Sequence, residues 1–297
     1  QVMRMYPITF KEYLRASDSQ TFNFVEQIVQ PEKLPLIILD KLKSEYRRYM
    51  VSGGMPEAAV SMLENQGMQA VDGILQGILD LYELDFAKYA EPREIPRIHA
   101  IWRSLPSQLA KENRKFIYKI IKKGARSRDY EDALLWLEDA GMIYRVNAVS
   151  KPGMPLSAYE EPDIFKIYAS DCGLLRRLAG LPGSIVIDPT ANYTEFKGAM
   201  AENAMLQSLL PSYGSMPYYW SSEGKAEIEF LLQREDEIIP VEVKAENCVS
   251  GRSIVVYNER YQPKNRIRFS FLNLQQNCGM LACPSPLAEW SMKWLLK

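Results

Sequence analysis

The chain has 297 residues, of which 47% are hydrophobic and 25% charged, and its formal net charge is −1. This length accommodates two or three domains, and the composition is typical of a globular protein. A net charge close to zero excludes a generally basic surface, so any nucleic-acid contact must come from a local cluster. Because the sequence has no apolar run of transmembrane length and no secretory leader, we expect a soluble, cytoplasmic protein without a membrane partner.

The supply of histidine and cysteine limits the chemistry further. His99 is the single histidine, which nearly excludes a Ser-His-Asp triad, a histidine metal cage and a histidine general base. Cys278 and Cys283 are the only closely spaced pair among four cysteines, and they lack a second pair or a neighbouring histidine for zinc. We therefore expect any reaction to depend on carboxylates, lysines and a bound metal ion.

Region 1–93 is predicted to be helical, because apolar side chains recur in it at helical spacing. One helix is expected to end at the Gly53–Gly54 pair, and Pro56 suits the first turn of the next helix. The phosphate-binding pattern GxxxxGK[ST] occurs nowhere in the chain. The glycine pair is therefore interpreted as a helix stop and not as a nucleotide site.

Region 94–159 combines a basic run with the element order of a winged helix. Eight lysines and arginines lie between Lys111 and Arg128, and Glu112 is the single acid among them. A helix, a short turn, a second helix capped by Asp129 and a strand follow one another, and the second helix of such a module can enter a DNA groove. The expected nucleic-acid contacts are Lys119, Lys122, Lys123 and Arg126.

The second helix of this region is itself acidic, which opposes insertion into a DNA groove. Its acids are Asp129, Glu131, Asp132, Glu138 and Asp139. Two alternatives to DNA contact therefore stay open, a basic run that only covers a solvated surface and a module that binds another protein.

Region 160–297 is predicted to be an α/β domain. The segment FKIYASDCGLLRRLAG changes from strand to helix near Asp171, and GAMAENAMLQSLL forms a helix that is expected to stop at Pro211. The strands YYWSSE, AEIEFLLQ, IIPVEVKA and IRFSFLNL follow. One helix leading into several strands indicates an α/β or α+β arrangement. Together with the helical first region, the predicted fold class is α+β and multidomain.

Two of these strands are expected to pair as a hairpin through the charged turn Arg234–Glu237. Side chains alternate along a strand, so Glu229 of the first strand lies on the same side as Glu242 and Lys244 of the second. An ordinary half-exposed hairpin produces the same alternation. The pattern therefore allows a site but does not require one.

Glu202, in the helix before the hairpin, strengthens the interpretation as a site. It lies beside the apolar positions of its helix, which are Met205, Leu206 and Leu209. A carboxylate in such a place is unfavourable unless it is paired. Its partner is either a lysine or arginine, or a divalent cation that it shares with Glu229 and Glu242.

Carboxylate oxygens suit Mg²⁺ or Mn²⁺, so Glu202, Glu229 and Glu242 are the predicted metal ligands. A metal held in this way activates water and stabilises negative charge on a phosphodiester. Glu242 and Lys244 are the predicted catalytic residues, and Lys244 would orient the water or stabilise the developing charge.

Glu202 on a helix, followed by Glu229 and by Glu242-Val-Lys244 on a hairpin, resembles the PD-(D/E)xK nuclease fold. The resemblance implies metal-dependent hydrolysis of nucleic acid. That family usually has aspartate at the first hairpin position, where this chain has the longer Glu229. A catalytically degenerate domain that binds nucleic acid or protein is therefore the alternative.

Longer segments resemble prokaryotic AAA-type ATPases that carry a C-terminal domain of unknown function. In chain order they are MYPITFKEYL, YMVSGGMPEAAV, KFIYKIIKKGARSRDYEDALLWLEDAGMIYRV, FKIYASDCGLLRRLAG, GAMAENAMLQSLL and the EIEFLL–PVEVKA hairpin. The resemblance implies a lid-like helical region at 1–93, a winged-helix-like module at 94–159 and a nuclease-like domain at 160–297. It also implies that ATP binds only to an ATPase core that precedes these residues, which makes that core a partner. A regulatory role without nucleic acid is a third alternative.

Overall fold

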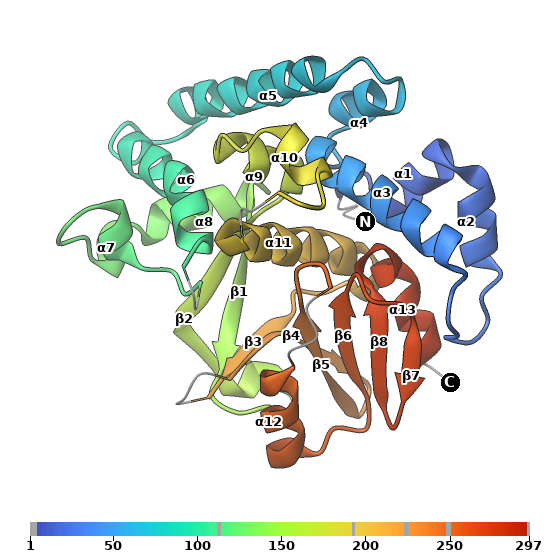
Figure 1. Cartoon of the computed structure of the whole chain (residues 1–297). Helices are drawn as coiled ribbons and strands as arrows, with labels where there is room; N and C mark the ends of the chain where they lie inside the picture. Colours follow the sequence, from blue (N-terminus) through green and yellow to red (C-terminus); the bar gives the residue numbers. More distant parts are fainter. Residues whose placement is uncertain (1–4, 112–113, 192–193, 223–225, 248–250, 296–297) are drawn as a thin grey trace. The chain divides into compact units, whose positions relative to one another are not determined.

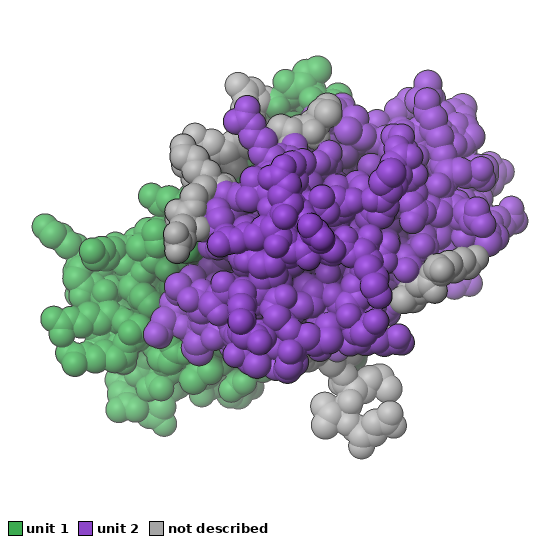
Figure 2. Space-filling model, turned by 90° about the horizontal axis from the view of Figure 1, so that it is seen from below, with its two compact units in different colours: residues 1–9, 47–145, 166–203 green, residues 10–46, 146–165, 204–297 purple. Residues whose placement is uncertain are grey.

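The computed structural model describes residues 5–111, 114–191, 194–222, 226–247 and 251–295. The chain divides into two compact units, each built from three separate segments (Figure 2). Unit 1 comprises residues 1–9, 47–145 and 166–203, and unit 2 comprises residues 10–46, 146–165 and 204–297. Four elements pass from one unit into the other: α3 (Leu36–Ser52), β1 (Ile143–Val149), β2 (Glu160–Ala169) and α11 (Thr194–Tyr213).

Unit 1 is mainly helical, as the sequence of the first region predicts (Figure 1). Its core includes Leu75 and Phe86 of one long helix and Ile98 and Trp102 of the next, all fully buried. Their spacing places them on one face of each helix. The long helix is α5 (Met68–Tyr89), and the next is α6 (Ile95–Leu109). The other helices of unit 1 are α4 (Pro56–Leu63), α7 (Tyr118–Ile121), η1 (Ser127–Asp129), α8 (Glu131–Asp139), α9 (Cys172–Leu178) and α10 (Gly183–Ile187).

The glycine pair confirms the predicted helix stop. Helix α3 ends at Ser52, Gly53 has a φ of +66°, and Pro56 opens α4. Asp171, the fully buried N-cap residue of α9, accepts the N–H of Gly54 at 2.6 Å and that of Leu174 at 2.9 Å. A Cβ atom on Gly53 would lie 2.0 Å from Oδ1 of Asp171. Glycine is therefore required here both for its backbone conformation and for the close approach of the carboxylate.

Two details of the predicted helices are wrong. The N-cap of α8 is Tyr130 and not Asp129, because a 3₁₀ turn precedes the helix and takes up Asp129. Helix α11 does not stop at Pro211 but runs on to Tyr213. A proline removes one N–H donor, yet the last turn still closes because the N–H of Gly214 donates to the carbonyl oxygen of Leu210 at 2.9 Å.

The strands form one eight-stranded mixed sheet in the order β2-β1-β3-β4-β5-β6-β8-β7. Strand β4 is antiparallel to both of its neighbours, and β5, β6 and β8 run parallel to one another. Helices hold 53% of the described residues and strands 18%, so the mixed α+β class is confirmed. The strands beyond β2 are β3 (Tyr218–Ser221), β4 (Glu227–Arg234), β5 (Glu237–Val243), β6 (Arg266–Ser270), β7 (Gln275–Asn277) and β8 (Met280–Pro284).

Helices complete the core of unit 2. Trp220 of β3 packs edge to face against Tyr257, at a ring distance of 5.3 Å. Residues far apart in sequence also meet here, since Trp290 donates to the carboxylate of Glu26 at 2.7 Å. The helices are α1 (Phe10–Ser17), α2 (Ser19–Glu26), η2 (Leu156–Tyr159), α12 (Arg252–Tyr261), η3 (Ser285–Leu287) and α13 (Ala288–Leu295). None of the described helices has both the length and the apolar character needed to cross a membrane.

Candidate functional site

The β4–β5 hairpin forms as predicted, and its turn lies at the expected place. Arg234 pairs with Glu237, and the register continues to the pair Phe230–Val241. The next residues, Glu229 and Glu242, therefore stand opposite each other. The hairpin is not half-exposed, because Ile228, Phe230, Leu231 and Leu232 of β4 are all buried. A central strand of a mixed sheet is covered on both faces, so Glu229 and Glu242 are buried as well.

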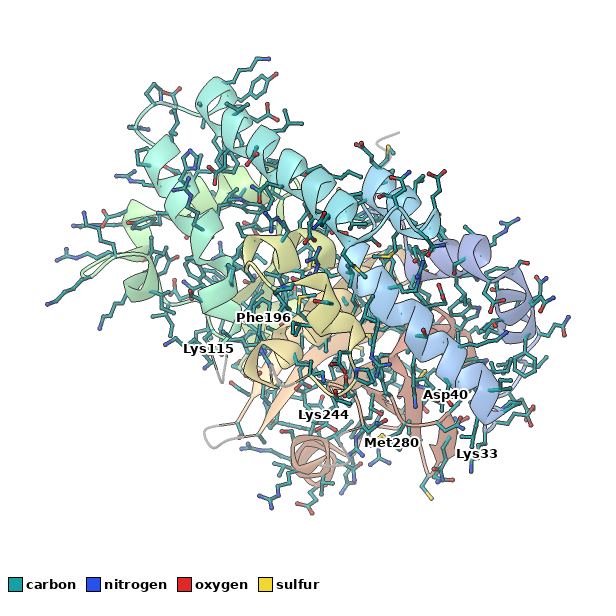
Figure 3. All side chains as sticks on the ribbon, turned by 45° about the horizontal axis from the view of Figure 1, so that its top comes forward. Lys33, Asp40, Lys115, Phe196, Lys244 and Met280 are labelled. Atoms are coloured by element: carbon teal, nitrogen blue, oxygen red, sulfur yellow. The ribbon has the colours of Figure 1, made fainter. Side chains whose placement is uncertain are left out.

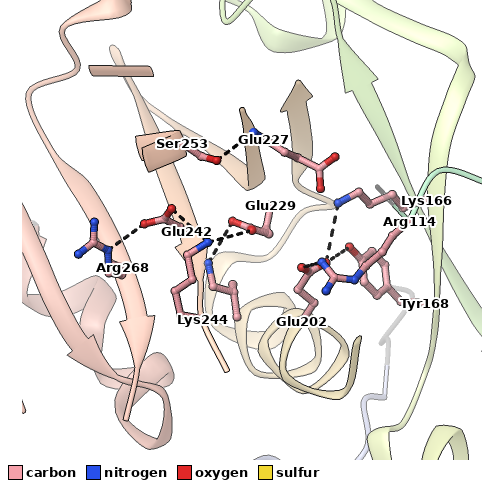
Figure 4. Close-up of polar contacts among 11 residues, drawn as sticks. Arg114, Lys166, Tyr168, Glu202, Glu227, Glu229, Glu242, Lys244, Ser253 and Arg268 are labelled. Carbon is pink, nitrogen blue, oxygen red and sulfur yellow. Dashed lines mark hydrogen bonds and ion pairs between the residues drawn. The ribbon is translucent and has the colours of Figure 1, made fainter. Parts of the chain in front are cut away.

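Lys244, at the end of β5, lies near both hairpin carboxylates (Figure 4). Its Nζ atom is 3.8 Å from Oε1 of Glu229 and 3.2 Å from Oε1 of Glu242. The side chain of Lys244 is 20% exposed, whereas that of Glu242 is fully buried. The lysine is therefore the member of this group that solvent reaches most easily.

The carboxylate of Glu229 contacts the backbone of β5 beyond the pair Phe230–Val241. Its Oε2 atom accepts the N–H of Val243 at 3.1 Å. This hydrogen bond fixes the Glu229 side chain against β5 and directs it toward Lys244. Glu229 thus makes a defined contact with the neighbouring strand.

Arg268 is a further member of the group that the sequence did not reveal. It stands opposite Glu242 in the parallel β5–β6 pairing, and its Nε atom donates to Oε2 of Glu242 at 2.8 Å. Two acids and two bases thus meet in unit 2. Arg268 follows the α12 crossover, so no turn length fixes its register against Glu242 in the sequence.

The partners of Glu202 include an arginine and a lysine, which is one of the two kinds of partner expected at its position. It is 2% exposed and forms an ion pair with Arg114. The hydroxyl of Tyr168 donates to its Oε2 atom at 3.1 Å, and Nζ of the fully buried Lys166 lies 3.8 Å from the same atom. These four residues belong to unit 1, whereas Glu229, Glu242 and Lys244 belong to unit 2. The burial of Glu202 is thus confirmed, and its share in a metal site stays a prediction.

The carboxylate oxygens of Glu229 and Glu242 are of the chemical type that binds divalent cations. Oε1 of Glu242 is buried and accepts no hydrogen bond from the described residues, although Lys244 lies nearby. Mg²⁺ is often bound by one or two carboxylates, with water and phosphate supplying its other ligands. Over the residues with defined placement, no three His, Cys, Asp or Glu side chains gather into a metal-binding group. Glu229 and Glu242 therefore fit an ion that takes most of its ligands from elsewhere.

The basic run forms an exposed segment around α7. Lys119, Lys122, Lys123 and Arg126 are all exposed, and the side chains of this segment point outward (Figure 3). Helix α7 has only four residues, so the first helix of the expected pair is a single turn. The hairpin acids belong to unit 2 and this basic run to unit 1.

We expect this basic run to bind DNA in a salt-dependent way. Replacing Lys119, Lys122, Lys123 and Arg126 with alanine should make the negative slope of log K against log[salt] shallower by roughly 3 to 4, because each lost phosphate contact removes about 0.9 from its magnitude. Fluorescence anisotropy of a labelled duplex between low and physiological salt measures this slope. A matched control neutralises four exposed bases of unit 2, which are Lys151, Arg252, Arg260 and Lys264. Equal slopes for both variants would identify the run as a solvated surface.

Two family models match separate segments of the chain. Residues 43–184 match a domain of unknown function (DUF8612). Residues 197–284 match another domain of unknown function (DUF4143), a family often found C-terminal to AAA ATPases. No curated protein and no solved structure matches the chain. The second matched segment contains the whole hairpin with Glu229, Glu242 and Lys244.

Proposed function

We propose that the chain is the C-terminal portion of an AAA-type ATP-binding protein and that region 160–297 is a nuclease-like domain. The DUF4143 match supports the link to AAA ATPases. In this proposal region 1–93 is lid-like, region 94–159 is the winged-helix-like module, and ATP binds to a preceding core. The proposed partners are nucleic acid, the ATPase core or another protein.

The hairpin geometry carries the catalytic part of the proposal. One observation is central: Lys244 lies within 3.8 Å of two carboxylates that come from two neighbouring strands. The helix α11, which bears Glu202, precedes the hairpin β4–β5, in the order the resemblance implies. A lysine held between two acids at a strand end is able to stabilise negative charge on a reacting phosphate.

The best-supported activity is metal-dependent hydrolysis of a phosphodiester in nucleic acid. Glu229 and Glu242 would hold Mg²⁺ or Mn²⁺, and Lys244 would orient the attacking water or stabilise the developing charge. The metal ion, when bound, lowers the pKa of water and stabilises negative charge on phosphate oxygens. Arg268 acts on Glu242 and not on the substrate, so it is a positioning residue.

A second candidate is a catalytically degenerate domain that binds nucleic acid or protein and regulates the ATPase. Its support is the ion pair between Arg268 and Glu242 at 2.8 Å. With Lys244 and Arg268 present, the charges of Glu229 and Glu242 are already balanced. Such a group is stable without a cation, and its burial is accounted for by pairing alone.

A cleavage assay tests the first candidate. Labelled single- and double-stranded DNA and RNA are incubated with the chain and Mg²⁺, Mn²⁺ or EDTA. We expect metal-dependent cleavage that falls by about 10² or more in Lys244→Ala and in Glu242→Gln, because each change removes a group that stabilises charge. Lys264→Ala, which removes an exposed lysine paired with Asp236, is the matched control and should keep full activity.

Absence of cleavage in both this chain and a full-length protein supplied with ATP would favour the degenerate domain. Cleavage that survives in Lys244→Ala and Glu242→Gln would place the reaction outside the hairpin. Both variants are first compared with the wild type by circular dichroism, because Glu242 is buried and its pairing contributes to stability.

A further inference from the structure

A pocket of unit 1 is lined by residues of α5, of α8 and of the turn after α8, and among the described residues it shares none with the hairpin or the basic run. Its volume is about 440 Å³, within the range of roughly 300–1,000 Å³ for small-molecule pockets. Aromatic and acidic side chains line most of it. These are Tyr82, Asp85, Tyr89, Trp136 and Asp139.

The aromatic walls are held in place by buried rings behind them. Trp136 meets Phe86 edge to face at a ring distance of 5.5 Å and an angle of 90°. Tyr82 contacts Trp102 in the same manner at 6.0 Å. Phe86 and Trp102 are fully buried, so the rings that face the pocket rest on a fixed support. A ligand that stacks on them would therefore find a preorganised surface.

The described residues that line the pocket include two carboxylates and no basic side chain. Asp85 and Asp139 are both exposed. Burial raises the pKa of Tyr82, and the negative charges of Asp171 and Asp85 raise it further. The pocket therefore disfavours an additional anion and favours a cation.

The aromatic ring at the pocket edge already attracts a cation of the chain. Nζ of Lys88 lies 4.7 Å from the centroid of the Tyr89 ring. Such cation–π contacts are favourable, and they are stronger where the cation is partly desolvated. The same attraction would act on a cation inside the pocket, where Tyr82 and Trp136 add two further rings.

We propose that this α5–α8 pocket binds a guanidinium group. A guanidinium is planar, stacks on aromatic faces and pairs with a carboxylate through two parallel hydrogen bonds. An ammonium group lacks the planar face and is more strongly hydrated, so it uses the same walls less well. The group is carried either by a free arginine-like molecule or by an arginine side chain of a protein partner.

Isothermal titration calorimetry with the whole chain tests this assignment. The probes are Nα-acetyl-L-argininamide, the corresponding lysine derivative and a Gly-Ala-Arg-Ala-Gly peptide. We expect saturable binding of the arginine derivative, weaker binding of the lysine derivative, and about tenfold weaker arginine binding in Asp85→Asn and in Asp139→Asn. Asp80→Asn on α5 and Asp132→Asn on α8 are controls, since both acids are exposed and do not line the pocket.

The two sources of the group give different results. A peptide that binds at least about tenfold more tightly than the arginine derivative indicates a protein partner, and equal affinities indicate a free molecule. Either result supports the proposal if Asp85→Asn and Asp139→Asn weaken binding and the control variants do not. The proposal is overturned if no probe binds saturably, or if Asp85→Asn and Asp139→Asn behave like Asp80→Asn and Asp132→Asn.

Discussion

Replacing Asp171 with alanine should lower the free energy of unfolding of the protein by about 2–4 kcal/mol. The carboxylate accepts two backbone N–H groups, those of Gly54 and Leu174. The buried N–H of Gly54 left without a partner costs about 1–3 kcal/mol, and loss of the N-cap contact to Leu174 costs about 1 kcal/mol. Urea unfolding followed by circular dichroism measures the change.

Asp188→Ala is the matched control for Asp171→Ala. Asp188 also accepts a backbone N–H, that of Thr190, but the contact is exposed. We expect little change in stability there, which is usual for exposed positions. The free energy of unfolding of Asp171→Asn should be close to that of Asp171→Ala, because an amide offers one acceptor oxygen where two N–H donors must be satisfied. Similar stabilities for Asp171→Ala and Asp188→Ala would show that the Asp171 hydrogen bonds, which connect the end of α3 with α9, are dispensable.

The second large effect concerns Glu202. Its replacement by alanine should cost about 3–5 kcal/mol, because it leaves the fully buried Lys166 without this counter-charge. The double variant Glu202→Leu with Lys166→Met should recover part of that loss, since apolar side chains of similar volume often replace a buried ion pair without penalty, while Arg114 and Tyr168 still lose their contacts with Glu202. Thermal and urea unfolding of the three proteins provide the comparison.

An exposed acid of the same unit is the control for this experiment. Glu57→Ala, in the first turn of α4, should change stability by less than about 1 kcal/mol. A double variant no more stable than Glu202→Ala would contradict the account of Glu202 as a partner of Lys166. If Mg²⁺ raises the unfolding midpoint of the wild type but not that of Glu202→Ala, Glu202 is instead assigned to a metal site.

Local signals in the sequence were sufficient for several elements. The helix stops at Gly53 because glycine allows the positive φ found there, and Pro56 then opens the next helix. Both residues are visible in the sequence. The hairpin register depends on the short turn between Arg234 and Glu237, which fixes the positions of Glu229 and Glu242 relative to each other. The opposition of those two acids could therefore be predicted before any tertiary contact was known.

The partners of these acids could not be predicted, because they come from distant segments. Arg268 reaches Glu242 through a parallel strand pairing after a helical crossover, which leaves the register open. Arg114 and Glu202 are 88 residues apart, and no local pattern relates them. The sequence allowed a lysine or arginine beside Glu202 but could not select Arg114 or Lys166. The α5–α8 pocket was missed for the same reason, since its acids lie on two helices separated in the chain.

The division of the chain into interleaved segments affects how the protein is made on the ribosome. The nascent chain changes unit after residues 9, 46, 145, 165 and 203, so neither unit is a continuous piece of the sequence. Glu26 and its partner Trp290 are 264 positions apart, and helices α1 and α2 are synthesised long before their core exists. Contacts of such separation form late and slowly. A protein synthesised only to residue 203 would contain every segment of unit 1 and would leave residues 10–46 exposed to proteases and to aggregation.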